Sequence, residues 1–213
     1  MSEGVLLVGA SGLAREVLAA GIVGVTGILD DDAELHGTTF HQTGLGGVPV
    51  LGSVDSAVDR DEQLLVCIGP SDVRRQVVRR LLDAGVAAER FAIFAARSAR
   101  IGASSDVGAG SILLDGVVVT ADARIGEHVV VMPNCTITHD DVIGDFATLA
   151  AGVALGGSVR VGKAAYLGMN ASVRQGLTIG KRSTVGMGSV VLTDVPEQQT
   201  WAGVPAQRLG EPE

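Results

Sequence analysis

The sequence predicts a chain built in two parts, a small α/β domain followed by a parallel β-helix. Three observations support this prediction. An aliphatic residue recurs every six positions from Ile101 to Val191, and a column of mostly small residues follows the same period. The chain also begins with an apolar run that stops at a glycine-rich turn. Its 213 residues leave room for both parts.

The repeat covers sixteen hexads in one unbroken register. A fixed short period indicates one structural unit stacked on its neighbours, each burying the apolar face of the last. Six residues are too few for a helical repeat, and β-branched side chains favour strands. The inward aliphatic positions are Ile101, Val107, Leu113, Val119, Ile125, Val131, Ile137, Ile143, Leu149, Leu155, Val161, Leu167, Val173, Ile179, Val185 and Val191.

A second column lies four residues after each of these aliphatics, and most of its members are small, as an inward position near a crowded corner requires. Glycine follows the aliphatic residue in nine of the sixteen hexads. We expect these glycines to provide tight turns with positive φ. The column runs through Ser105, Ser111, Val117, Ala123, Val129, Cys135, Asp141, Ala147, Val153, Val159, Ala165, Ala171, Leu177, Ser183, Ser189 and Val195.

The first part opens with a predicted strand over Val5–Val8, which stops at Gly9, and a helical pattern begins after Gly12. Strand, glycine-rich turn and helix form the first unit of a nucleotide-binding α/β domain, where turn amides and the helix N-terminus can hold phosphates. The dinucleotide G-x-G-x-x-G pattern is not met, because Ser11 and Ala14 stand at its later glycine positions. A tight turn without a ligand therefore stays open as the alternative.

Two further strands are predicted to end at the same edge of this domain. Val25–Leu29 leads into three consecutive aspartates, which are placed to accept hydrogen bonds from a ribose or a base, although a solvated acidic loop is the alternative. Leu64–Ile68 is closed by Gly69. Since strands that end in Gly9 and Gly69 share the carboxyl edge of a parallel sheet, we expect a common ligand crevice there.

The remaining elements complete the predicted division of the chain. Residues 33–47 are predicted to be irregular, with a weak helix from Ser53. Ser71 is the expected N-cap of a helix through Ala84, which Gly85 ends. Phe91–Phe94 is the last strand of a first domain covering residues 1–97. Residues 98–213 form the repeat domain, whose tail after Val195 is expected to cap the open coil.

Composition narrows the function classes. The net charge of −8, from 16 basic and 24 acidic residues, argues against nucleic acid as a partner. No apolar run approaches the ~20 residues that span a bilayer, and Met1–Gly4 opens no signal-peptide pattern. Cys67 and Cys135 stand in apolar, strand-like contexts, so we expect buried thiols and a cytoplasmic protein with an aliphatic core.

One hexad departs from the others in composition, because it places His139, Asp140 and Asp141 in consecutive positions. Histidine accepts a proton near neutral pH, and a neighbouring carboxylate can hold its tautomer and stabilise the imidazolium. An inward Asp141 is costly unless paired, which favours a functional position over the alternative, a surface histidine on a solvated turn. The other histidines, His36, His41 and His128, are predicted to lie on the surface. His128 and His139, eleven residues apart with no third histidine in the array, do not make a convincing set of metal ligands.

The hexad array resembles the left-handed β-helix of hexapeptide-repeat acyltransferases. This resemblance implies a left-handed path with three hexads in each coil, a rare exception to right-handed crossovers. A narrower resemblance, to nucleotide-sugar N-acetyltransferases of 4-amino-4,6-dideoxy sugars and related sialic acid O-acetyltransferases, covers nearly the whole chain. Its motifs are Gly9-Ala10-Ser11-Gly12 with Arg15-Glu16, Leu29-Asp30-Asp31, Ile68-Gly69, the segment Ile137–Phe146, and Gly203-Val204-Pro205-Ala206.

The resemblance implies a homotrimer that binds acetyl-CoA in the groove between adjacent β-helices, with the sugar reaching the histidine at a subunit boundary. It makes His139 the general base, Asp140 its acidic partner and the Gly157 amide a donor to the acetyl carbonyl. It assigns the nucleotide sugar to Gly9, Ser11, Gly12, Asp31, Asp32 and Gly69. It assigns coenzyme A to Gly168, Asn170, Gly186 and either Lys181 or Arg182.

The chain departs from the family pattern around this site. Many relatives have His at the positions of Leu13 and Thr148, Asn-Thr at Met132-Pro133, Cys at Asp141 and Lys at Gln207. Leu13 weakens the assignment of the pyrophosphate, Thr148 removes a residue expected near the acetyl donor, and Met132 removes a substrate contact. Because His139 is retained, these changes predict an active enzyme with an altered substrate preference.

Three functions remain open at this point. The first is acetyl-CoA-dependent N-acetylation of the 4-amino group of a nucleotide-linked amino-deoxy sugar, by direct attack without an acyl-enzyme. The second is O-acetylation of a sugar or sialic acid, with the same base activating a hydroxyl. The third is a trimeric binding protein that has lost turnover. The intact His139–Asp140 pair favours an enzyme over the third.

Overall fold

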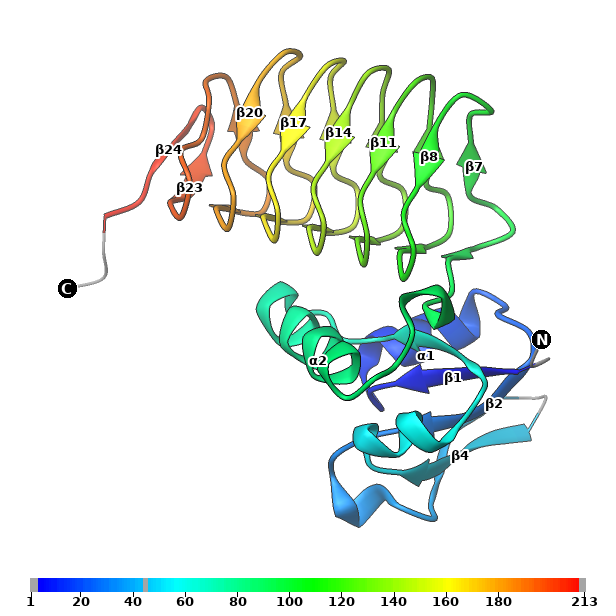
Figure 1. Cartoon of the computed structure of the whole chain (residues 1–213). Helices are drawn as coiled ribbons and strands as arrows, with labels where there is room; N and C mark the ends of the chain where they lie inside the picture. The colour runs from blue at the N-terminus through cyan, green and yellow to red at the C-terminus, as the bar shows by residue number, and fades with distance from the viewer. Residues whose placement is uncertain (1–3, 44–45, 211–213) are drawn as a thin grey trace.

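The computed structural model describes residues 4–43 and 46–210, which form an α/β domain and a β-helix lying side by side (Figure 1). The domain holds a five-stranded sheet of order β3-β4-β2-β1-β5, parallel except for the β3–β4 pair. Its strands are β1 (Val5–Val8), β2 (Val25–Leu29), β3 (Thr39–Thr43), β4 (Gly46–Gly52) and β5 (Gln63–Val66). Its helices are α1 (Gly12–Ala19), α2 (Ser71–Asp83) and the 3₁₀ turns Ala33–Leu35, Val54–Asp59 and Ala88–Arg90.

Sequence and structure differ in three places within this domain. The segment predicted to be irregular contains β3 and the start of β4, and the polar Thr and Gln residues of β3 concealed that strand. Pro70, not Ser71, is the N-cap of α2, and the Ser71 hydroxyl instead lies 3.1 Å from that of Thr148. Phe91 forms only an isolated bridge to Leu64, and β6 begins at Phe94. The predicted glycine stop holds, since Gly85 has φ +100°.

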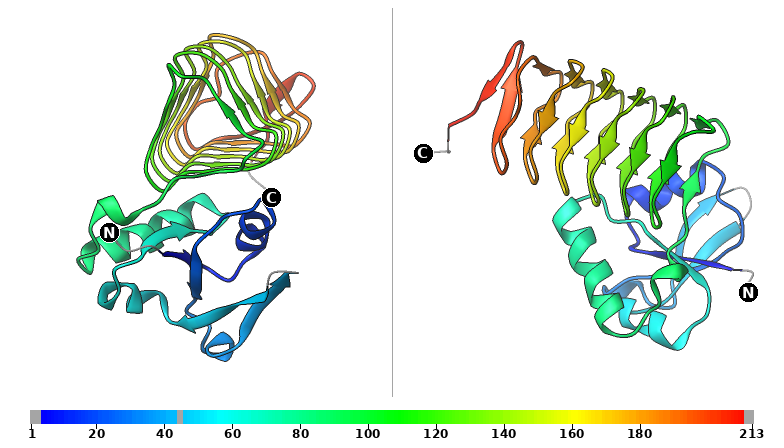
Figure 2. Two further views of the ribbon diagram at one scale, coloured as in Figure 1. Left: turned by 90° about the vertical axis from the view of Figure 1, so that its right-hand side faces the viewer. Right: turned by 45° about the horizontal axis from the view of Figure 1, so that its top comes forward.

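The repeats form a left-handed β-helix of triangular cross-section, which confirms the predicted fold class (Figure 2). Each strand pairs in parallel with the strand eighteen residues later, so three hexads complete one coil. All sixteen predicted aliphatics end a two-residue strand. The strands are β6 (Phe94–Ala95), β7 (Arg100–Ile101), β8 (Asp106–Val107), β9 (Ile112–Leu113), β10 (Val118–Val119), β11 (Arg124–Ile125), β12 (Val130–Val131), β13 (Thr136–Ile137), β14 (Val142–Ile143), β15 (Thr148–Leu149), β16 (Ala154–Leu155), β17 (Arg160–Val161), β18 (Tyr166–Leu167), β19 (Ser172–Val173), β20 (Thr178–Ile179), β21 (Thr184–Val185) and β22 (Val190–Val191).

The three faces of the β-helix are named here by their strands. The first sheet contains β7, β10, β13, β16, β19 and β22, and the second contains β8, β11, β14, β17 and β20. The third contains β6, β9, β12, β15, β18 and β21, and is extended by the hairpin of β23 (Thr200–Gly203) and β24 (Ala206–Arg208). Trp201 and Ala206 of this hairpin pack against the aliphatic core, so the described part of the tail covers the last coil.

Glycines that follow the aliphatics have a different role from the one predicted. Positive φ falls two residues later in the hexad, for example at Asp122, His128 and Asp140. A Cβ at Gly102 or Gly108 would instead overlap the backbone of the next coil. These glycines therefore allow close stacking of coils, and the strained turn position is occupied by many residue types.

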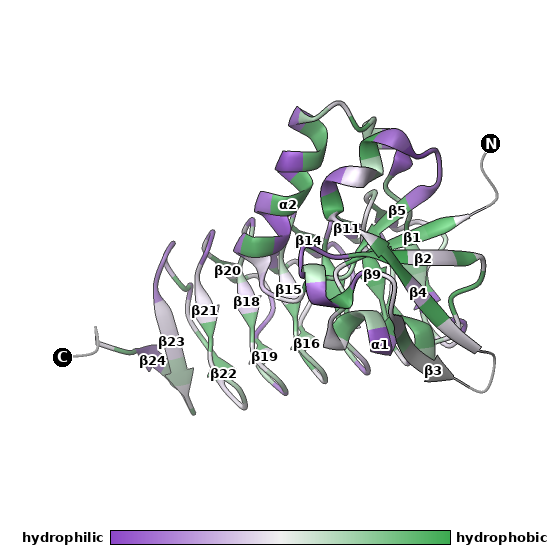
Figure 3. Ribbon diagram, turned by 90° about the horizontal axis from the view of Figure 1, so that it is seen from below, coloured by the Kyte–Doolittle hydropathy of each residue, from purple (hydrophilic) through white to green (hydrophobic). Residues whose placement is uncertain are grey.

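The α/β domain packs against the third sheet. One face of its own sheet carries α2, and the other face shares a core with α1 and the third-sheet residues Ile112, Leu114 and Val130. Figure 3 shows the domain lying over β9 and β15 and leaving β21–β24 uncovered. The contact places the carboxyl edge of the domain sheet beside the β-helix.

A buried arginine makes many of the hydrogen bonds that join the two parts. Arg74 of α2 is fully buried, and burial lowers the pKa of its guanidinium to about 10, so it remains charged at neutral pH. No carboxylate among the described residues pairs with it; carbonyl and hydroxyl oxygens accept its hydrogen bonds instead. These acceptors are the carbonyls of Ile68, Gly69, His128, Phe146 and Ala147 and the hydroxyl of Thr148, at 2.7–3.3 Å.

Candidate active site

The exposed pair of His139 and Asp140 lies on the turn between β13 and β14, at the corner of the first and second sheets. Asp140 has φ +62°, and its Oδ2 lies 2.8 Å from His139 Nδ1. That hydrogen bond, reinforced by the charges of Asp140 and Asp141, raises the pKa of His139 above its ordinary value. The contact at Nδ1 leaves Nε2 free to accept a proton, as a general base requires.

Asp141 points inward, as the register predicts, and its side chain is fully buried. Its Oδ2 accepts the Thr138 amide at 2.7 Å, and its Oδ1 accepts the Val159 amide at 2.8 Å. Burial raises the pKa of Asp141 to about 6, although these two amides act in the opposite direction. The inward carboxylate is thus satisfied by backbone donors.

Gly157 occupies the same turn position as His139, one coil later, and lies directly against the imidazole. A Cβ at Gly157 would overlap the ring. Its carbonyl accepts the Gly176 amide, but no described residue accepts the Gly157 N–H. An open amide therefore stands beside the base, where it can donate to an oxygen that gains negative charge.

We expect Gly157→Ala to lower kcat by roughly 10- to 100-fold, because the new methyl group displaces the imidazole from its place beside the amide. The backbone itself tolerates a side chain here, since Ala121 holds the same turn position one coil before His139. Steady-state release of coenzyme A measures the effect, and Ala121→Ser is the matched control. Unchanged turnover in Gly157→Ala would show that the ring position is not limiting.

The predicted crevice exists as an interdomain pocket of about 870 Å³ between the carboxyl edge of the α/β sheet and the third sheet. It brings together Ser11, Gly12 and Gly69, as expected. Gly9 lies beneath them with φ +102°, and the Ser11 hydroxyl donates to the Cys67 carbonyl at 2.6 Å. The remaining lining is largely apolar: Leu13, Glu16, Pro70, Val130, Met132, Pro133, Thr148, Ala150, Ala151, Tyr166 and Met169.

The three departures from the family pattern at Leu13, Met132 and Thr148 all line this one pocket. Thr148 is only 5% exposed and is held by Arg74 and Ser71. Within one chain it lies on the third sheet, away from the corner that carries His139. These three departures therefore change the pocket, whereas the departure at Asp141 lies beside His139.

The carboxylates after β2 are used within the domain. Asp31 accepts Arg80 at 2.9 Å and the Val54 amide at 3.1 Å, and its hydrogen bond with Arg80 lowers its pKa. Asp32 caps the 3₁₀ turn at Glu34. Neither residue is among those that line the interdomain pocket. Asp30, the first of the three aspartates, accepts the Ala10 amide at 2.7 Å and so shapes the glycine-rich turn.

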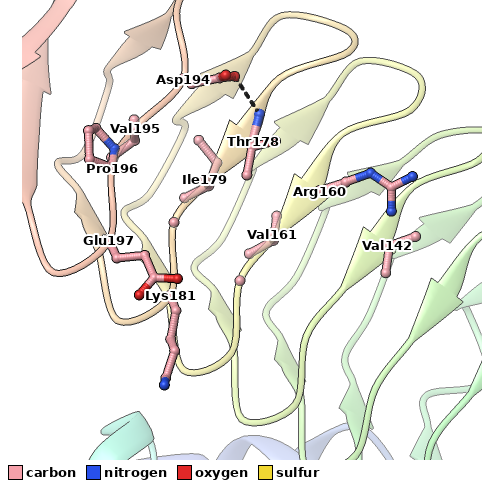
Figure 4. A pocket seen from close by; sticks show the side chains of 12 residues that line it. Val142, Arg160, Val161, Thr178, Ile179, Lys181, Asp194, Val195, Pro196 and Glu197 are labelled. Atoms are coloured by element: carbon pink, nitrogen blue, oxygen red, sulfur yellow. Dashed lines mark hydrogen bonds between the residues drawn. The ribbon is translucent and has the colours of Figure 1, made fainter.

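The residues assigned to coenzyme A lie on different edges of one β-helix. Gly168, Asn170 and Gly186 follow third-sheet strands, and a Cβ at either glycine would meet the next turn closely. Lys181 follows a second-sheet strand and lines a separate pocket of about 440 Å³ on that sheet, together with Arg160 (Figure 4). Only Gly157 shares the corner of His139.

His128 was predicted to lie on the surface, and this prediction is wrong. The residue is 3% exposed, stacked on Phe146 and edge-on to Phe91, with ring centroids 5.1 and 4.7 Å away. Burial, helped by the Arg74 cation, lowers its pKa to about 4. The aromatic partners come from distant segments, so no local signal revealed the burial. His36 is exposed as expected, whereas the His41 side chain lies outside the described residues.

Reactive cysteines, clusters of metal ligands and membrane-spanning helices are absent from the described part of the chain. Cys67 and Cys135 are free, buried thiols, as predicted, and burial raises the pKa of Cys135 to about 11. Among residues 4–43 and 46–210, no three His, Cys, Asp or Glu side chains gather as metal ligands would. No helix within the same ranges is long and apolar enough to cross a bilayer.

Of three comparisons with known proteins, only the comparison with solved structures gives matches, and these cover nearly the whole chain. No protein-family model and no curated protein sequence matches it. Among solved structures, GDP-perosamine N-acetyltransferase from Caulobacter crescentus, in complex with CoA and GDP-perosamine, is 31% identical, with 98% of this chain and 97% of that chain covered and a TM-score of 0.85. The acetyltransferase domain of PglB from Neisseria gonorrhoeae, in complex with acetyl coenzyme A, is 26% identical over 98% and 100%, with a TM-score of 0.85. WeeI from Acinetobacter baumannii is 29% identical over 98% and 100%, with a TM-score of 0.84.

An α/β domain docked on a left-handed β-helix, with a histidine–carboxylate pair on a β-helix corner, defines the class of hexapeptide-repeat acyltransferases. The 31% identity spans almost the full length of both chains. The chain therefore belongs to the hexapeptide-repeat sugar N-acetyltransferases.

Proposed function

We propose that this enzyme transfers the acetyl group of acetyl-CoA to the 4-amino group of a nucleotide-linked amino-deoxy sugar. The observation that carries the proposal is the exposed His139–Asp140 pair beside the open Gly157 amide. It stands on a fold shared, over nearly the whole chain, with a protein whose structure contains CoA and GDP-perosamine.

In the proposed reaction, the sugar amine attacks the thioester carbonyl directly. The nitrogen–carbon bond forms, the carbon–sulfur bond breaks, and the thiolate of CoA leaves. His139 Nε2 takes the proton of the amine, while Asp140 holds Nδ1 and stabilises the imidazolium. The Gly157 N–H donates to the carbonyl oxygen as it gains charge. An acyl-enzyme at Cys135 is disfavoured, because that thiol is buried and its pKa is raised.

The interdomain pocket is the proposed site of the nucleotide sugar. Ser11, Gly12 and Gly69 line it, and the first-turn amides of α1 can donate to an anion bound there. Apolar residues at the positions of Leu13 and Met132 favour a substrate that presents apolar surface there. Asp31 forms an ion pair with Arg80, so its predicted contact with the nucleobase of the substrate requires that ion pair to rearrange.

Gly12→Ala is expected to raise KM for the nucleotide sugar by roughly tenfold, equivalent to about 1.4 kcal/mol of binding, with little effect on KM for acetyl-CoA. A Cβ there meets only the Arg15 guanidinium, at 3.9 Å, so folding is unaffected while close approach of a phosphate is blocked. Initial rates with each substrate varied in turn measure both constants. Gly210→Ala, equally free of steric contact, is the control, and equal changes in both KM values would contradict the assignment.

We further propose that the active unit is a homotrimer. In one chain the interdomain pocket opens toward the corner of the third and first sheets, whereas His139 stands at the corner of the first and second. A neighbouring copy must therefore bring its His139 to the pocket. The first sheet suits an interface, since its outward residues after Arg100 are uncharged: Val118, Thr136, Ala154, Ser172 and Val190. The second sheet presents Asp106, Arg124 and Arg160.

Sedimentation equilibrium is expected to give three times the chain mass of 21.6 kDa at micromolar concentration. The uncharged first sheet is the face we expect to be covered. Thr136→Arg should then shift the mass toward the monomer, whereas Thr178→Arg on the second sheet should not. A monomeric wild-type protein at these concentrations would refute the arrangement.

Release of the CoA thiol in the presence of GDP- or UDP-linked 4-amino-4,6-dideoxy sugars tests the activity itself. We expect turnover with at least one such sugar and a product acetylated on nitrogen, identified by mass spectrometry. The matching 4-hydroxy sugars separate O-acetylation from N-acetylation. Turnover only with hydroxyl acceptors, or with none of the sugars, would overturn the proposed function.

A further inference from the structure

The column that contains Asp141 shows that the coil does not need a carboxylate at this position. Six residues succeed one another at this corner, each eighteen residues from the last, and Asp141 alone among them is charged. Its immediate neighbours in the stack, Ala123 and Val159, are apolar and fully buried. A buried charge between two apolar residues is costly, so a function other than closing the coil explains it better. The column is Ser105, Ala123, Asp141, Val159, Leu177 and Val195.

Asp141 makes one hydrogen bond that two serines of the inward column also make, and one that they do not. Ser105 and Ser111 each accept the amide eighteen residues later, at 3.0 and 2.9 Å, as Asp141 accepts that of Val159. The second oxygen of Asp141 also accepts the Thr138 amide at 2.7 Å. The carboxylate is therefore bonded to two successive turns at once.

Those two turns carry the groups proposed to perform the reaction. Thr138 immediately precedes His139, and Val159 lies two residues after Gly157. A backbone bond from Ser158 N–H to the His139 carbonyl, 2.9 Å long, also joins the two turns. Asp141 thus connects the base and the open amide through two short hydrogen bonds in the interior.

We infer that Asp141 is a positioning residue for the acetyl transfer, fixing the turn of His139 relative to that of Gly157 and placing a second negative charge beneath the imidazole. This inference rests on the proposed function. Asp141 touches no substrate in this role and acts only through its two neighbouring turns.

The negative charge of Asp141 changes the pKa of His139 in a known direction. Asp140 and Asp141 both raise the pKa of His139. The adjacent coils present Ala121 and Gly157 at the same turn position, and Asp122, stacked before Asp140, is the other nearby acid. Removing the charge of Asp141 lowers the pKa of His139. The low-pH limb of kcat/KM, where the protonated ring is inactive, then moves to lower pH.

Two substitutions and one matched control test the inference. Asp141→Ser retains a hydroxyl for the Val159 amide, as Ser111 does for Val129, but loses the Thr138 bond and the charge. Asp141→Asn retains the shape and one acceptor oxygen, but it removes the charge and turns an NH2 group toward one of the two amides. Ser111→Ala removes a buried acceptor in the equivalent column at a different corner, far from His139 in the repeat.

We expect Asp141→Ser to lower kcat by roughly 10- to 100-fold with both KM values within about twofold of wild type. Asp141→Asn should also lower kcat, because it leaves one of the two amides without an acceptor, and both variants should move the acid limb to lower pH. Ser111→Ala should lower the thermal midpoint and leave kcat and the acid limb unchanged. If both Asp141 variants lose only thermal stability, as Ser111→Ala does, Asp141 is merely structural and the inference fails.

Titration of the histidine ring signals by NMR provides a readout that does not depend on turnover. The chain has four histidines, and His139→Asn assigns the relevant signal. We expect the His139 midpoint to move to lower pH in both Asp141 variants and to stay fixed in Ser111→Ala. A wild type without activity on any nucleotide amino sugar would refute the proposed function, while an unmoved midpoint would refute the role of Asp141.

Discussion

Replacing His139 with alanine is expected to lower kcat by roughly 10²–10⁴-fold while leaving the fold and acetyl-CoA binding nearly intact. The side chain is exposed and contributes no core contact, so the loss is that of the proton acceptor. Asp140→Asn should lower kcat less, because it weakens the hold on Nδ1 without removing the base. Steady-state CoA release and thermal unfolding of the same samples separate activity from stability.

The pH dependence of the wild type follows from the same pair. Because Asp140 raises the pKa of His139, the ring stays protonated to a higher pH than an isolated histidine. The value of kcat/KM should therefore rise with pH through an apparent pKa above the ordinary one. His36→Ala, at another exposed histidine, is the control and should leave the profile unchanged. Near wild-type turnover in His139→Ala would place the base elsewhere.

The second large effect is expected at Arg74. Arg74→Ala should lower the free energy of unfolding by about 3–5 kcal/mol, because it leaves several buried carbonyl oxygens without hydrogen-bond donors. Arg74→Lys should recover only part of this loss, since an ammonium has three donors and cannot reproduce the planar fork. Urea denaturation followed by circular dichroism measures both variants.

Arg80 is the matched control for this experiment, because it lies on the same helix and forms ion pairs with Asp31 and Asp55 at the surface. Arg80→Ala should cost about 1 kcal/mol or less. If Arg74→Ala costs no more than Arg80→Ala, the buried network does not hold the domains together. A large loss confined to Arg74 would identify the interdomain contact as a principal source of stability.

Local periodicity made the β-helix predictable. Every aliphatic position from Ile101 to Val191 ends a strand, because the period, the side-chain type and the inward direction are all set within six residues. Strands β1 and β2 were placed correctly for a similar reason, as apolar runs bounded by glycine or aspartate. The His139–Asp140 pair was recognisable because it interrupts a regular pattern.

Features that depend on distant contacts were not predictable in this way. The burial of His128 requires Phe91 and Phe146, and the role of Arg74 requires carbonyls from three separate segments. The convergence of Leu13, Met132 and Thr148 on one pocket likewise appears only once the α/β domain is docked. The sequence of β3, TFHQT, lacked the alternation that marks a half-buried strand.

The constant spacing of eighteen residues between paired strands has a consequence for how the molecule is assembled in time. Every new coil closes a loop of the same length, so each addition carries the same entropic penalty and gains a similar interface. If coils are added from the end that packs against the α/β domain, each addition therefore changes the free energy by a similar amount. Destabilising substitutions in β22 or β23 should open only the last coils locally. Substitutions near Arg74 should instead destabilise the first coils, on which the later ones stack.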